Sequence, residues 1–391
     1  MKRLFIVVRS ISFGAGVGGM EKAAKQHLEE MRSVGFKIFL VAPKEKIVGN
    51  IPDDITLINV PWPKWDKYKI LMTMGVAYRL WCKSVAVKLE SEAQKHDIVH
   101  MHGASAGVLE FIDDNLLKDI MTVVNPHGME EFGSGSVFRL INRAFTRNLM
   151  RKAKKADIVI ATDASLQKEV MKNIEVKSEQ IVVIPNTIDI TRLRLLVSET
   201  ERIKEQDLHI VSVGRIEYNK GYDILAESLS GMNLKKTINN KYKWIHFGRG
   251  KMQRKIQEFC IKNNINLEIH SNSSDSEVQT SIANSDIFIQ PSRYEGSSLT
   301  TLEAMSHGAL IVAMPVGGIP DKIYNGTTGF LCADVSSVAL SESILQAIEC
   351  TEKEEIRNNA KRYVEDNFDI SISTKKYSEL YNKLSIKKGL R

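Results

Sequence analysis

Short apolar runs alternate with longer amphipathic stretches along most of the chain. Several runs are apolar without interruption, which is typical of strands in a parallel sheet that is covered on both faces. The pattern predicts strands at residues 4–8, 37–41, 55–60, 97–102, 120–125, 157–161 and 181–185, and again at 210–213, 244–247, 267–269, 287–289 and 309–313. Between strands of the first set it predicts helices at residues 20–34, 70–95 and 137–156.

A polar, charged segment at residues 194–206 separates these two sets of elements. A chain of 391 residues is also too long for one ordinary hydrophobic core, and this length suggests two domains. We therefore predict an α/β protein with two doubly wound, Rossmann-like domains that face a cleft. The first domain is expected over residues 1–193, and the second begins at residue 194.

Composition and charge narrow the class of protein. With 43% hydrophobic and 26% charged residues, the chain is typical of soluble globular proteins. The net charge of +7 suits an anionic partner such as a phosphate, a membrane surface or a nucleic acid. The scattered cysteines lack the spacing of disulfide or zinc sites, which favours a reducing compartment. The first apolar run is too short for an export signal and no stretch suits a membrane span, so we expect a cytoplasmic protein.

The segment at residues 286–307 carries the clearest chemical signal. Its strand is followed by a loop that contains Glu295 and then by a helix that contains Glu303. Unpaired N–H groups at the start of a helix attract phosphates, and this helix starts at Ser298, Leu299 and Thr300. Because open α/β sheets bind ligands at the carboxyl ends of their strands, we predict a phosphate-bearing ligand that is met by two carboxylates.

Two cations follow the first strand of the second domain. Arg215 comes directly after the strand and Lys220 lies five residues further along. A guanidinium fork and a point charge can together hold a diphosphate, whereas two surface cations in a loop would have no such role. The loop after the next strand contains Gly248 and Gly250, which either let the chain pass close to a base or ribose or only end the strand.

The first domain offers a glycine-rich loop and several histidines. Gly18 and Gly19 precede a predicted helix, where they form either a phosphate or sugar contact or merely a tight turn. His127 follows a strand, and in this architecture we expect its side chain to face the cleft. Of His100 and His102 we expect only one to face a given side of the strand, with His102 nearer the cleft, and we expect no metal site.

Two stretches combine basic and apolar residues. Residues 61–88 contain Trp62, Trp65 and Trp81 among lysines, and residues 139–155 carry an arginine stripe with no acidic residue. This pattern is typical either of an interfacial helix on anionic lipid or of a solvated helix face that packs on the sheet. No nucleic-acid-binding motif accompanies the charges, so we expect no nucleic acid as a partner.

In combination, these motifs resemble the family-four retaining glycosyltransferases. The residues that match the family are Pro291-Ser292, the Glu295 and Glu303 pair with seven residues between them, and Gly214-Arg215 with Lys220-Gly221. Gly18-Gly19-Met20-Glu21 is similar to the Gly-Gly-x-Glu loop of the family. The resemblance implies a GT-B fold, in which the second domain spans residues 194–369 and a last helix at residues 370–391 crosses back to the first domain.

The resemblance also implies roles for the residues singled out above. Arg215 and Lys220 would bind the phosphates of the donor and offset charge on the leaving nucleotide, and Glu303 would accept the ribose hydroxyls. Glu295 would lie near the sugar and its phosphate, as nucleophile or as electrostatic stabiliser, and His127 would contact the transferred sugar. The remaining positions expected at the nucleotide or its sugar are Gly18, Gly19, Gly248, Gly250, Ser298, Leu299 and Thr300.

The implied reaction is the transfer of a sugar, with retention, from a UDP- or GDP-sugar to a glycan or lipid-linked acceptor. No metal or other cofactor is expected, because Arg215 and Lys220 can stabilise the developing charge. Bacterial surface polysaccharide or lipopolysaccharide synthesis is the implied setting, with the enzyme on the inner face of the plasma membrane. The alternatives are a nucleotide-sugar epimerase or a phosphorylase of the same fold, and a non-catalytic membrane-associated binding protein.

Overall fold

The computed structural model describes residues 2–14, 19–64, 73–129, 132, 144–197, 207–234 and 242–387. Its contacts divide the chain into two compact units. Unit 1 consists of Met1–Asn186 together with Ser371–Arg391, and unit 2 is Thr187–Ile370. The change from unit 1 to unit 2 therefore precedes helix α7 (Ile190–Leu196), whereas the sequence pattern placed it after residue 193.

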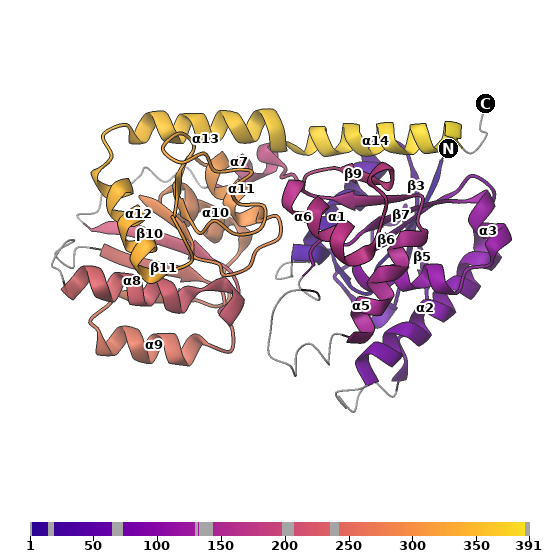
Figure 1. Ribbon diagram of the computed structural model, residues 1–391, viewed down its shortest axis with the longest axis horizontal. Helices are drawn as coiled ribbons and strands as arrows, with labels where there is room; N and C mark the ends of the chain where they lie inside the picture. The colour runs from indigo at the N-terminus through magenta and orange to yellow at the C-terminus, as the bar shows by residue number, and fades with distance from the viewer. Residues whose placement is uncertain are drawn as a thin grey trace. The chain divides into compact units, whose positions relative to one another are not determined.

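Unit 1, whose first part runs from indigo to magenta in Figure 1, is built on a parallel sheet with the strand order β5-β3-β1-β6-β7-β8-β9. The order runs outward in both directions from β1, which is the arrangement of a doubly wound sheet. A small separate sheet pairs β2 (Ile11–Ser12) with β4 (Ile47–Val48). The strands of the main sheet are β1 (Arg3–Val7), β3 (Lys37–Ala42), β5 (Thr56–Asn59), β6 (Ile98–His102), β7 (Met121–Asn125), β8 (Ile158–Ala161) and β9 (Ile181–Val183).

Apolar side chains cover both faces of this sheet. Successive side chains of a strand point to opposite faces, so Phe5 and Val7 enter one core cluster while Leu4 and Ile6 enter another. This two-sided burial explains why the strands are apolar without interruption. The helices of unit 1 are α1 (Gly19–Ser33), α2 (Thr73–Glu92), α3 (Asp114–Asp119), α5 (Ala144–Arg151), α6 (Ala164–Ile174) and α14 (Ile370–Lys387), with 3-10 segments η1 (Lys44–Lys46), η3 (Gly103–Glu110), η4 (Lys152–Lys155) and η5 (Ser178–Gln180).

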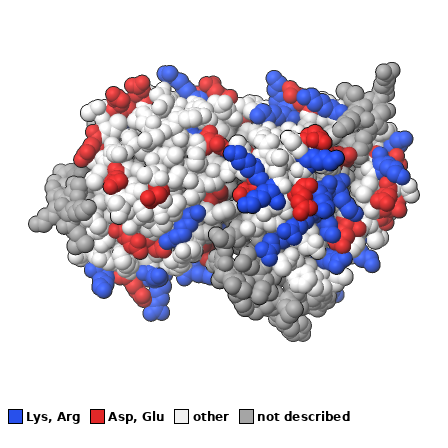
Figure 2. All heavy atoms as spheres, in the orientation of Figure 1, with Lys and Arg blue, Asp and Glu red and all other residues white. Residues whose placement is uncertain are grey.

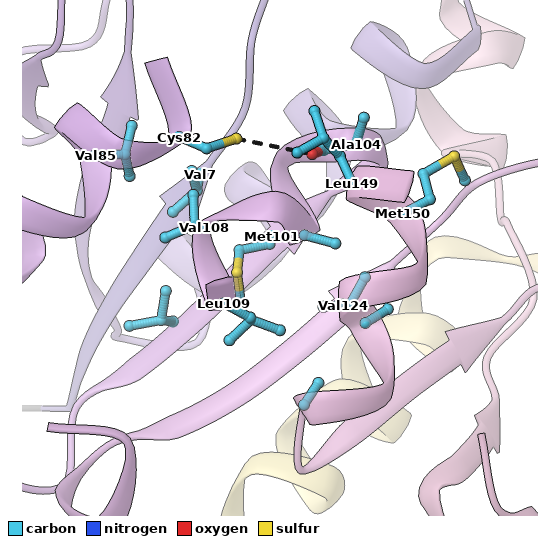
Figure 3. Close-up of a cluster of buried hydrophobic side chains, with 14 of the residues drawn as sticks. Val7, Cys82, Val85, Met101, Ala104, Val108, Leu109, Val124, Leu149 and Met150 are labelled. Atoms are coloured by element: carbon cyan, nitrogen blue, oxygen red, sulfur yellow. Dashed lines mark hydrogen bonds between the residues drawn. The ribbon is translucent and has the colours of Figure 1, made fainter. Parts of the chain in front are cut away.

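The core on one of these faces is shown in Figure 3. Val7, Met101 and Val124 from three neighbouring strands lie against side chains of α2, η3 and α5. Cys82 of α2 is buried there, and its thiol donates to the carbonyl oxygen of Ala104 at 3.9 Å. Burial raises the pKa of this thiol, which suits a structural rather than a reactive cysteine.

Unit 2 contains a second parallel sheet, ordered β12-β11-β10-β13-β14-β15. The order reverses between β10 and β13, which are paired with each other although two strands intervene in the sequence. The strands are β10 (Leu208–Val213), β11 (Tyr242–Phe247), β12 (Leu267–His270), β13 (Ile287–Gln290), β14 (Leu310–Ala313) and β15 (Phe330–Leu331). Besides α7 and the 3-10 turn η6 (Tyr218–Lys220), the helices are α8 (Tyr222–Leu234), α9 (Gln253–Lys262), α10 (Asp275–Ala283), α11 (Leu299–Ser306), α12 (Ser337–Glu349) and α13 (Lys353–Phe368).

The strands expected from the apolar runs are all present, with ends displaced by a few residues. The structure adds β2, β4 and β15, which have two residues each and are too short to give a periodic signal. The expected helix at 137–156 is described from Ala144 onward and changes to a 3-10 turn at Lys152, and its first part lies outside the described residues. Among the described helices, none combines the length and the apolar character needed to cross a bilayer.

The chain enters and leaves unit 2 at two adjacent points. The N–H of Ile188 donates to the carbonyl oxygen of Phe368 at 2.9 Å, and the N–H of Ile370 donates to that of Ile188 at 2.9 Å. Helix α14 follows, and its residues from Ser371 belong to unit 1, where Tyr377 and Tyr381 enter the core cluster of Leu4 and Ile6. The last helix thus completes the first unit.

Candidate active site

The strand-order switch of unit 2 brings two loops together, one after β10 and one after β13. The N–H groups of Arg293 and Tyr294 donate to the carbonyl oxygen of Asn219 at 2.9 and 3.2 Å. Gly221, with a φ of +69°, lies against the carbonyl of Pro291, where any Cβ atom would collide with the backbone. Ligands of doubly wound sheets bind at such a switch point, so the fold itself marks this place as a candidate site.

Lys220 and Glu295 form an ion pair at this switch point. The ammonium Nζ of Lys220 lies 2.7 Å from Oε2 and 3.0 Å from Oε1 of Glu295. The same Oε2 accepts hydrogen bonds from Ser292 Oγ at 2.9 Å and from Gln290 Nε2 at 3.3 Å. A carboxylate with this many donors is held in a fixed orientation, and its pairing with Lys220 was not anticipated from the sequence.

A second ion pair ties the same two loops together. Both guanidinium nitrogens of Arg293 bond the carboxylate of Asp223, at 2.6 and 2.8 Å. The Arg293 guanidinium also stacks over the ring of Tyr218 at 4.1 Å and donates to the carbonyl oxygen of that residue. Bidentate pairing adds geometric specificity to charge, so Arg293 fixes the loop that carries Lys220. Sequence reasoning assigned no role to Arg293.

Arg215 lies in the loop between β10 and Lys220 and its side chain is exposed. Within the described part of the chain it makes no ion pair, so its guanidinium is available for an anion. Gly248, with a φ of +139°, and Gly250 lie against the carbonyls of Gly214 and Ile216, and a Cβ atom at either glycine would collide with them. The structure therefore gives both glycines a part in holding the Arg215 loop, and their contact with a nucleotide stays a prediction.

A buried polar network of hydrogen bonds holds the Arg215 loop. His246 Nε2 lies 3.0 Å from the carbonyl oxygen of Gly214, and His246 Nδ1 lies 2.8 Å from Ser212 Oγ. Because a carbonyl only accepts, Nε2 carries the proton and Nδ1 accepts from the serine hydroxyl, which itself accepts from Trp244 Nε1 at 2.8 Å. Burial lowers the pKa of His246 to about 4, so the network is neutral near pH 7.

Helix α11 begins at the same edge of the sheet. Ser298 caps it, since Ser298 Oγ accepts from the N–H of Thr301 at 3.3 Å, while Leu299 and Thr300 are partly exposed. Thr300 Oγ1 donates to Gln290 Oε1 at 3.2 Å. The side chain of Lys322 is buried, and its Nζ donates to Ser297 Oγ at 3.0 Å and to the carbonyl oxygen of Gly318 at 3.2 Å. Lys322 thus fixes the start of the α11 loop to the turn after β14.

Glu303 lies in α11 and is buried. Gln279 Nε2 donates to Glu303 Oε2 at 3.0 Å, and Gln279 Oε1 lies 2.8 Å from His307 Nε2. Burial lowers the pKa of His307 to about 4, so His307 is neutral and its Nε2–H donates to Gln279. This arrangement orients Glu303 without neutralising its charge.

In unit 1, His127 follows β7 with an uncommon backbone conformation. Its φ is +63°, and its N–H donates to Asn125 Oδ1 at 2.9 Å. His127 Nε2 lies 2.6 Å from His102 Nδ1. Burial lowers the pKa of His127 to about 4. A non-glycine residue in this region of φ costs about 1–2 kcal/mol, and such strain concentrates at functional sites.

His102 belongs to a larger group of buried histidines. His100 and His102 both lie on the same face of β6, with rings stacked at 4.7 Å, so the expectation that only one could face a given side is wrong. The reason is geometric, because side chains two residues apart in a strand share a face. Tyr381 of α14 joins the group, with its hydroxyl 2.7 Å from both His27 Nε2 and His100 Nδ1.

Other expected site residues can be placed only in part. Gly19 begins α1 and is exposed, whereas Gly18 lies outside the described residues. The first residues of the arginine stripe also lie outside them, and Arg151 donates to the carbonyl oxygen of Asn173 at 3.3 Å. Trp62 and Trp81 are buried in the core of unit 1, so they are core residues and not membrane anchors.

Comparison with known protein families identifies both parts of the chain. Residues 17–192 match the model for Glycosyltransferase Family 4, and residues 196–364 match the model for Glycosyl transferases group 1. The chain belongs to glycosyltransferase family 4. Its fold is GT-B, with two Rossmann-like α/β domains. The resemblance seen in the sequence is thereby confirmed.

Individual relatives of this family-4 chain are distant. It is 31% identical over 190 residues to a glycogen synthase of Thermodesulfovibrio yellowstonii, a match that covers 46% of this chain and 36% of that protein. It is 24% identical over 335 residues to an uncharacterized glycosyltransferase of Methanocaldococcus jannaschii, which covers 85% of each. The chain thus matches only about a third of the length of that glycogen synthase.

Solved structures share the fold over nearly the whole length. WaaG, a glycosyltransferase involved in lipopolysaccharide biosynthesis, aligns with a TM-score of 0.74 at 17% identity, covering 99% of this chain and 100% of that one. HepE of Anabaena in complex with UDP-glucose aligns with a TM-score of 0.72 at 16% identity, covering 98% and 100%. At such identities the likeness establishes the GT-B fold alone.

Proposed function

We propose that this protein is a retaining glycosyltransferase that moves a hexosyl residue from a UDP- or GDP-sugar to a glycan or lipid-linked acceptor. The observation that carries the proposal is the Lys220–Glu295 pair at the strand-order switch of unit 2, with the start of α11 beside it. A cation, a carboxylate and a helix N-terminus at one point suit a glycosyl diphosphate, whose phosphates are anionic and whose anomeric carbon becomes cationic during transfer.

In this proposal the diphosphate contacts Lys220, Arg215 and the first backbone amides of α11. The partly exposed Leu299 and Thr300 are the residues whose N–H groups would meet it. Arg215 and Lys220 would offset the charge that develops on the leaving diphosphate, so no divalent metal is required. The likeness to HepE, whose structure contains UDP-glucose, supports a nucleoside-diphosphate sugar as the donor.

Glu303 and Glu295 have separate roles in the proposal. Glu303 accepts the ribose hydroxyls, and its orientation by Gln279 supports this assignment. Glu295 stays close to the anomeric carbon, either as nucleophile or as electrostatic stabiliser. His127 contacts the transferred sugar, an assignment that its strained backbone supports.

The acceptor is proposed to belong to a bacterial surface polysaccharide or lipopolysaccharide, and the enzyme to bind the inner face of the plasma membrane. The likeness to WaaG supports this setting. The exposed face of α2 supports membrane contact, since Val76, Leu80 and Val87 are 38%, 44% and 59% exposed there. Exposed cations of the same helix lie between them at Arg79 and Lys83, and Lys88 follows Val87.

On the face drawn in Figure 2, Lys and Arg side chains also gather on unit 1, over the part where Figure 1 draws α5 and α6. Interleaved apolar and cationic side chains are typical of helices that lie in an anionic lipid interface. The buried Trp62 and Trp81 contribute nothing to this surface, so the proposal of membrane contact rests on the exposed residues of α2.

A donor screen tests the enzymatic proposal. The purified chain is incubated with UDP-, GDP- and ADP-sugars in the presence of EDTA, and release of the nucleoside diphosphate is measured. We expect slow hydrolysis of one UDP- or GDP-sugar that EDTA does not reduce, and faster release with acceptor glycans. Proton NMR of the product is expected to show the anomeric configuration of the donor.

Other outcomes identify the alternatives. A sugar with one inverted stereocentre, together with free UDP, would indicate an epimerase. Release of a sugar 1-phosphate that depends on inorganic phosphate would indicate a phosphorylase. Binding of a nucleotide without turnover of any donor would indicate a non-catalytic protein.

Vesicle sedimentation tests the membrane surface separately. The chain is expected to bind vesicles that contain about 30 mol% phosphatidylglycerol. It should dissociate from them as salt is added, because salt screens the cations over a Debye length of roughly 8–10 Å. Replacing Leu80 and Val87 by Glu should abolish binding, whereas Ile261→Glu on α9, at a residue that is 78% exposed, serves as the matched control. Equal binding by both variants would contradict the proposed α2 surface.

A further inference from the structure

Three nearly parallel imidazole rings form a row at the carboxyl ends of β6 and β7. The ring centroids of His100 and His102 lie 4.7 Å apart, and those of His102 and His127 lie 4.9 Å apart, with an interplanar angle of 16° in each pair. His100 and His102 are fully buried and rigidly placed by the strand. The rings of His102 and His127 lie edge to edge, since nitrogens 2.6 Å apart allow a centroid distance as large as 4.9 Å only when both lie on the line between the rings.

One hydrogen bond joins the last two rings of the row. His102 Nδ1 and His127 Nε2 lie 2.6 Å apart, and burial lowers the pKa of both rings. Two neutral imidazoles can form this bond only if one nitrogen carries a proton and the other does not. Among the described residues, His102 Nε2 and His127 Nδ1 have no hydrogen-bond partner. The bond thus couples the tautomers of the two rings, because His127 can change its tautomer and keep the bond only if His102 changes as well.

The backbone around His127 directs its ring toward this bond. Asn125 Oδ1 accepts the N–H of His127, and the N–H of Gly128 donates to the carbonyl oxygen of Pro126 at 2.8 Å. These bonds hold His127 at its positive φ of 63°. Specific hydrogen bonds thus maintain a strained backbone at the residue whose side chain bonds His102. Strain that is held in this way indicates a geometry that matters for function.

We propose that His102 is a positioning residue, which fixes the ring of His127, couples the tautomer of His127 to its own and leaves His127 Nδ1 as the nitrogen that meets the substrate. The proposal rests on the proposed function, in which His127 contacts the transferred sugar. A sugar hydroxyl then meets the Nδ1 atom in one defined direction. The energetic reason is that a change of tautomer at His127 alone would break the bond to His102 inside a desolvated site.

A metal ion explains the same histidines less well. One nitrogen from each of His27, His100 and His102 lies within 4.8 Å of the others. A metal binds in the plane of an imidazole ring at about 2.0–2.1 Å, and two nearly parallel stacked rings do not direct their lone pairs to one point. The chain of hydrogen bonds accounts for the observed ring orientations without moving them.

Three substitutions of His102 distinguish an effect of its hydrogen bond from an effect of its packing. The amide of Asn reaches the position of the Nδ1 atom and can bond His127 Nε2, the amide of Gln reaches the position of Nε2 instead, and Leu only fills space. We expect His102→Leu and His102→Gln to lower kcat for sugar transfer roughly 10- to 100-fold with less than about a threefold change in donor KM, because the partner that sets a histidine tautomer acts mainly in the transition state. His102→Asn should retain kcat within about threefold.

Nitrogen-15 NMR of selectively labelled histidine supplies a readout that does not depend on activity. In the unmodified protein His102 and His127 should show matching neutral tautomers, both Nδ1–H or both Nε2–H, and in His102→Leu the tautomer populations of His127 should change. His96→Asn is the matched control, since His96 lies before β6 with a φ of +74° that Asn tolerates, and it should change neither spectrum nor kcat.

Tautomer populations of His127 that do not match those of His102 in the unmodified protein would overturn the proposal, as would equal kcat values for the Asn, Gln and Leu variants. Zinc that remains bound at one equivalent after chelation and is lost in His102→Leu would also overturn it. If His127→Ala transfers sugar at the normal rate while the tautomer signature behaves as expected, the role of His127 in the proposed function fails and the positioning by His102 stands.

Discussion

At the scale of single residues, the Lys220–Glu295 pair places opposite charges where the donor is proposed to bind. Both side chains are largely buried, with 18% and 11% of their surfaces exposed. A partly desolvated cation of this kind exerts a stronger field than one in water. Lys220 therefore orients Glu295, and in the proposed function it would also offer positive charge to a phosphate.

Replacing Lys220 by Ala should depress turnover more than donor binding. Loss of one charge-stabilising donor at a reacting centre typically costs about 10²–10³ in kcat, and Glu295 would in addition lose its cation. Steady-state kinetics with the donor identified by the screen would measure the effect. Lys255→Ala on the exposed face of α9 is the matched control, and near-normal kinetics of Lys220→Ala would remove its role at the phosphate.

Replacing Glu303 by Ala should mainly weaken donor binding. Its carboxylate is buried and oriented by Gln279, so the variant loses charge-assisted hydrogen bonds to the ribose of roughly 1.5–3 kcal/mol each. Titration calorimetry with the nucleoside diphosphate should show a dissociation constant raised about tenfold or more. An unchanged constant together with a reduced kcat would instead place Glu303 at the chemistry.

At the scale of elements, the sequence predicts strands and switch-point loops well because their signals are local. Continuous apolar runs such as 287–289 mark strands that are buried on both faces, and the polar residues directly after them mark the carboxyl edge of the sheet. Arg215, Lys220, Glu295 and Glu303 could be singled out on that basis. The residues that pair with them by hydrogen bonds and ion pairs could not be predicted in this way.

The bonds that position the site join residues far apart in sequence. Arg293 pairs with Asp223 and Lys220 with Glu295, separations of 70 and 75 residues. Tyr381 meets His100 over a separation of 281 residues. No periodic pattern encodes such pairs, because they depend on which strands become neighbours. Gln290 and Ser292 gave a weak signal as polar residues at the end of a buried strand, whereas Lys322 gave none.

Helix α14 is held on unit 1 through the hydroxyl of Tyr381. This hydroxyl bonds two buried histidines at 2.7 Å, whereas the hydroxyl of Tyr377 lies 3.5 Å from Asn125 Nδ2. Tyr381→Phe leaves His27 and His100 each without a buried partner and should lower the free energy of unfolding by about 2–5 kcal/mol. Tyr377→Phe, the matched change on the same helix, should cost about 1 kcal/mol or less. Urea denaturation would measure both, and equal losses would contradict the assignment.

At the scale of the whole molecule, several buried histidines are neutral in the folded state. Burial lowers the pKa of His27 to about 3 and that of His127 and His246 to about 4. Between these values and the ordinary pKa of about 6.5, the unfolded chain binds protons that the folded chain does not. Stability is therefore fully present above about pH 6.5 and is lost as the pH falls toward 4, by up to roughly 1.4 kcal/mol per pH unit for each such histidine.

Urea unfolding at a series of pH values would test this expectation. The free energy of unfolding should be almost the same at pH 7.5 and pH 8, where the histidines are neutral in both states, and should decline steeply below pH 6.5. A value that does not change between pH 7 and pH 5 would show that these histidines are solvated or paired with acids in the folded protein.

The return of the chain to unit 1 through α14 has a consequence for the order of events during synthesis. Unit 2 is one continuous stretch, Thr187–Ile370, whereas unit 1 lacks Tyr377 and Tyr381 until α14 has left the ribosome. Domains fold as units when all their parts are available. The N-terminal domain, although translated first, is therefore the last to be completed, and until then its nascent sheet exposes an apolar face that a chaperone would recognise.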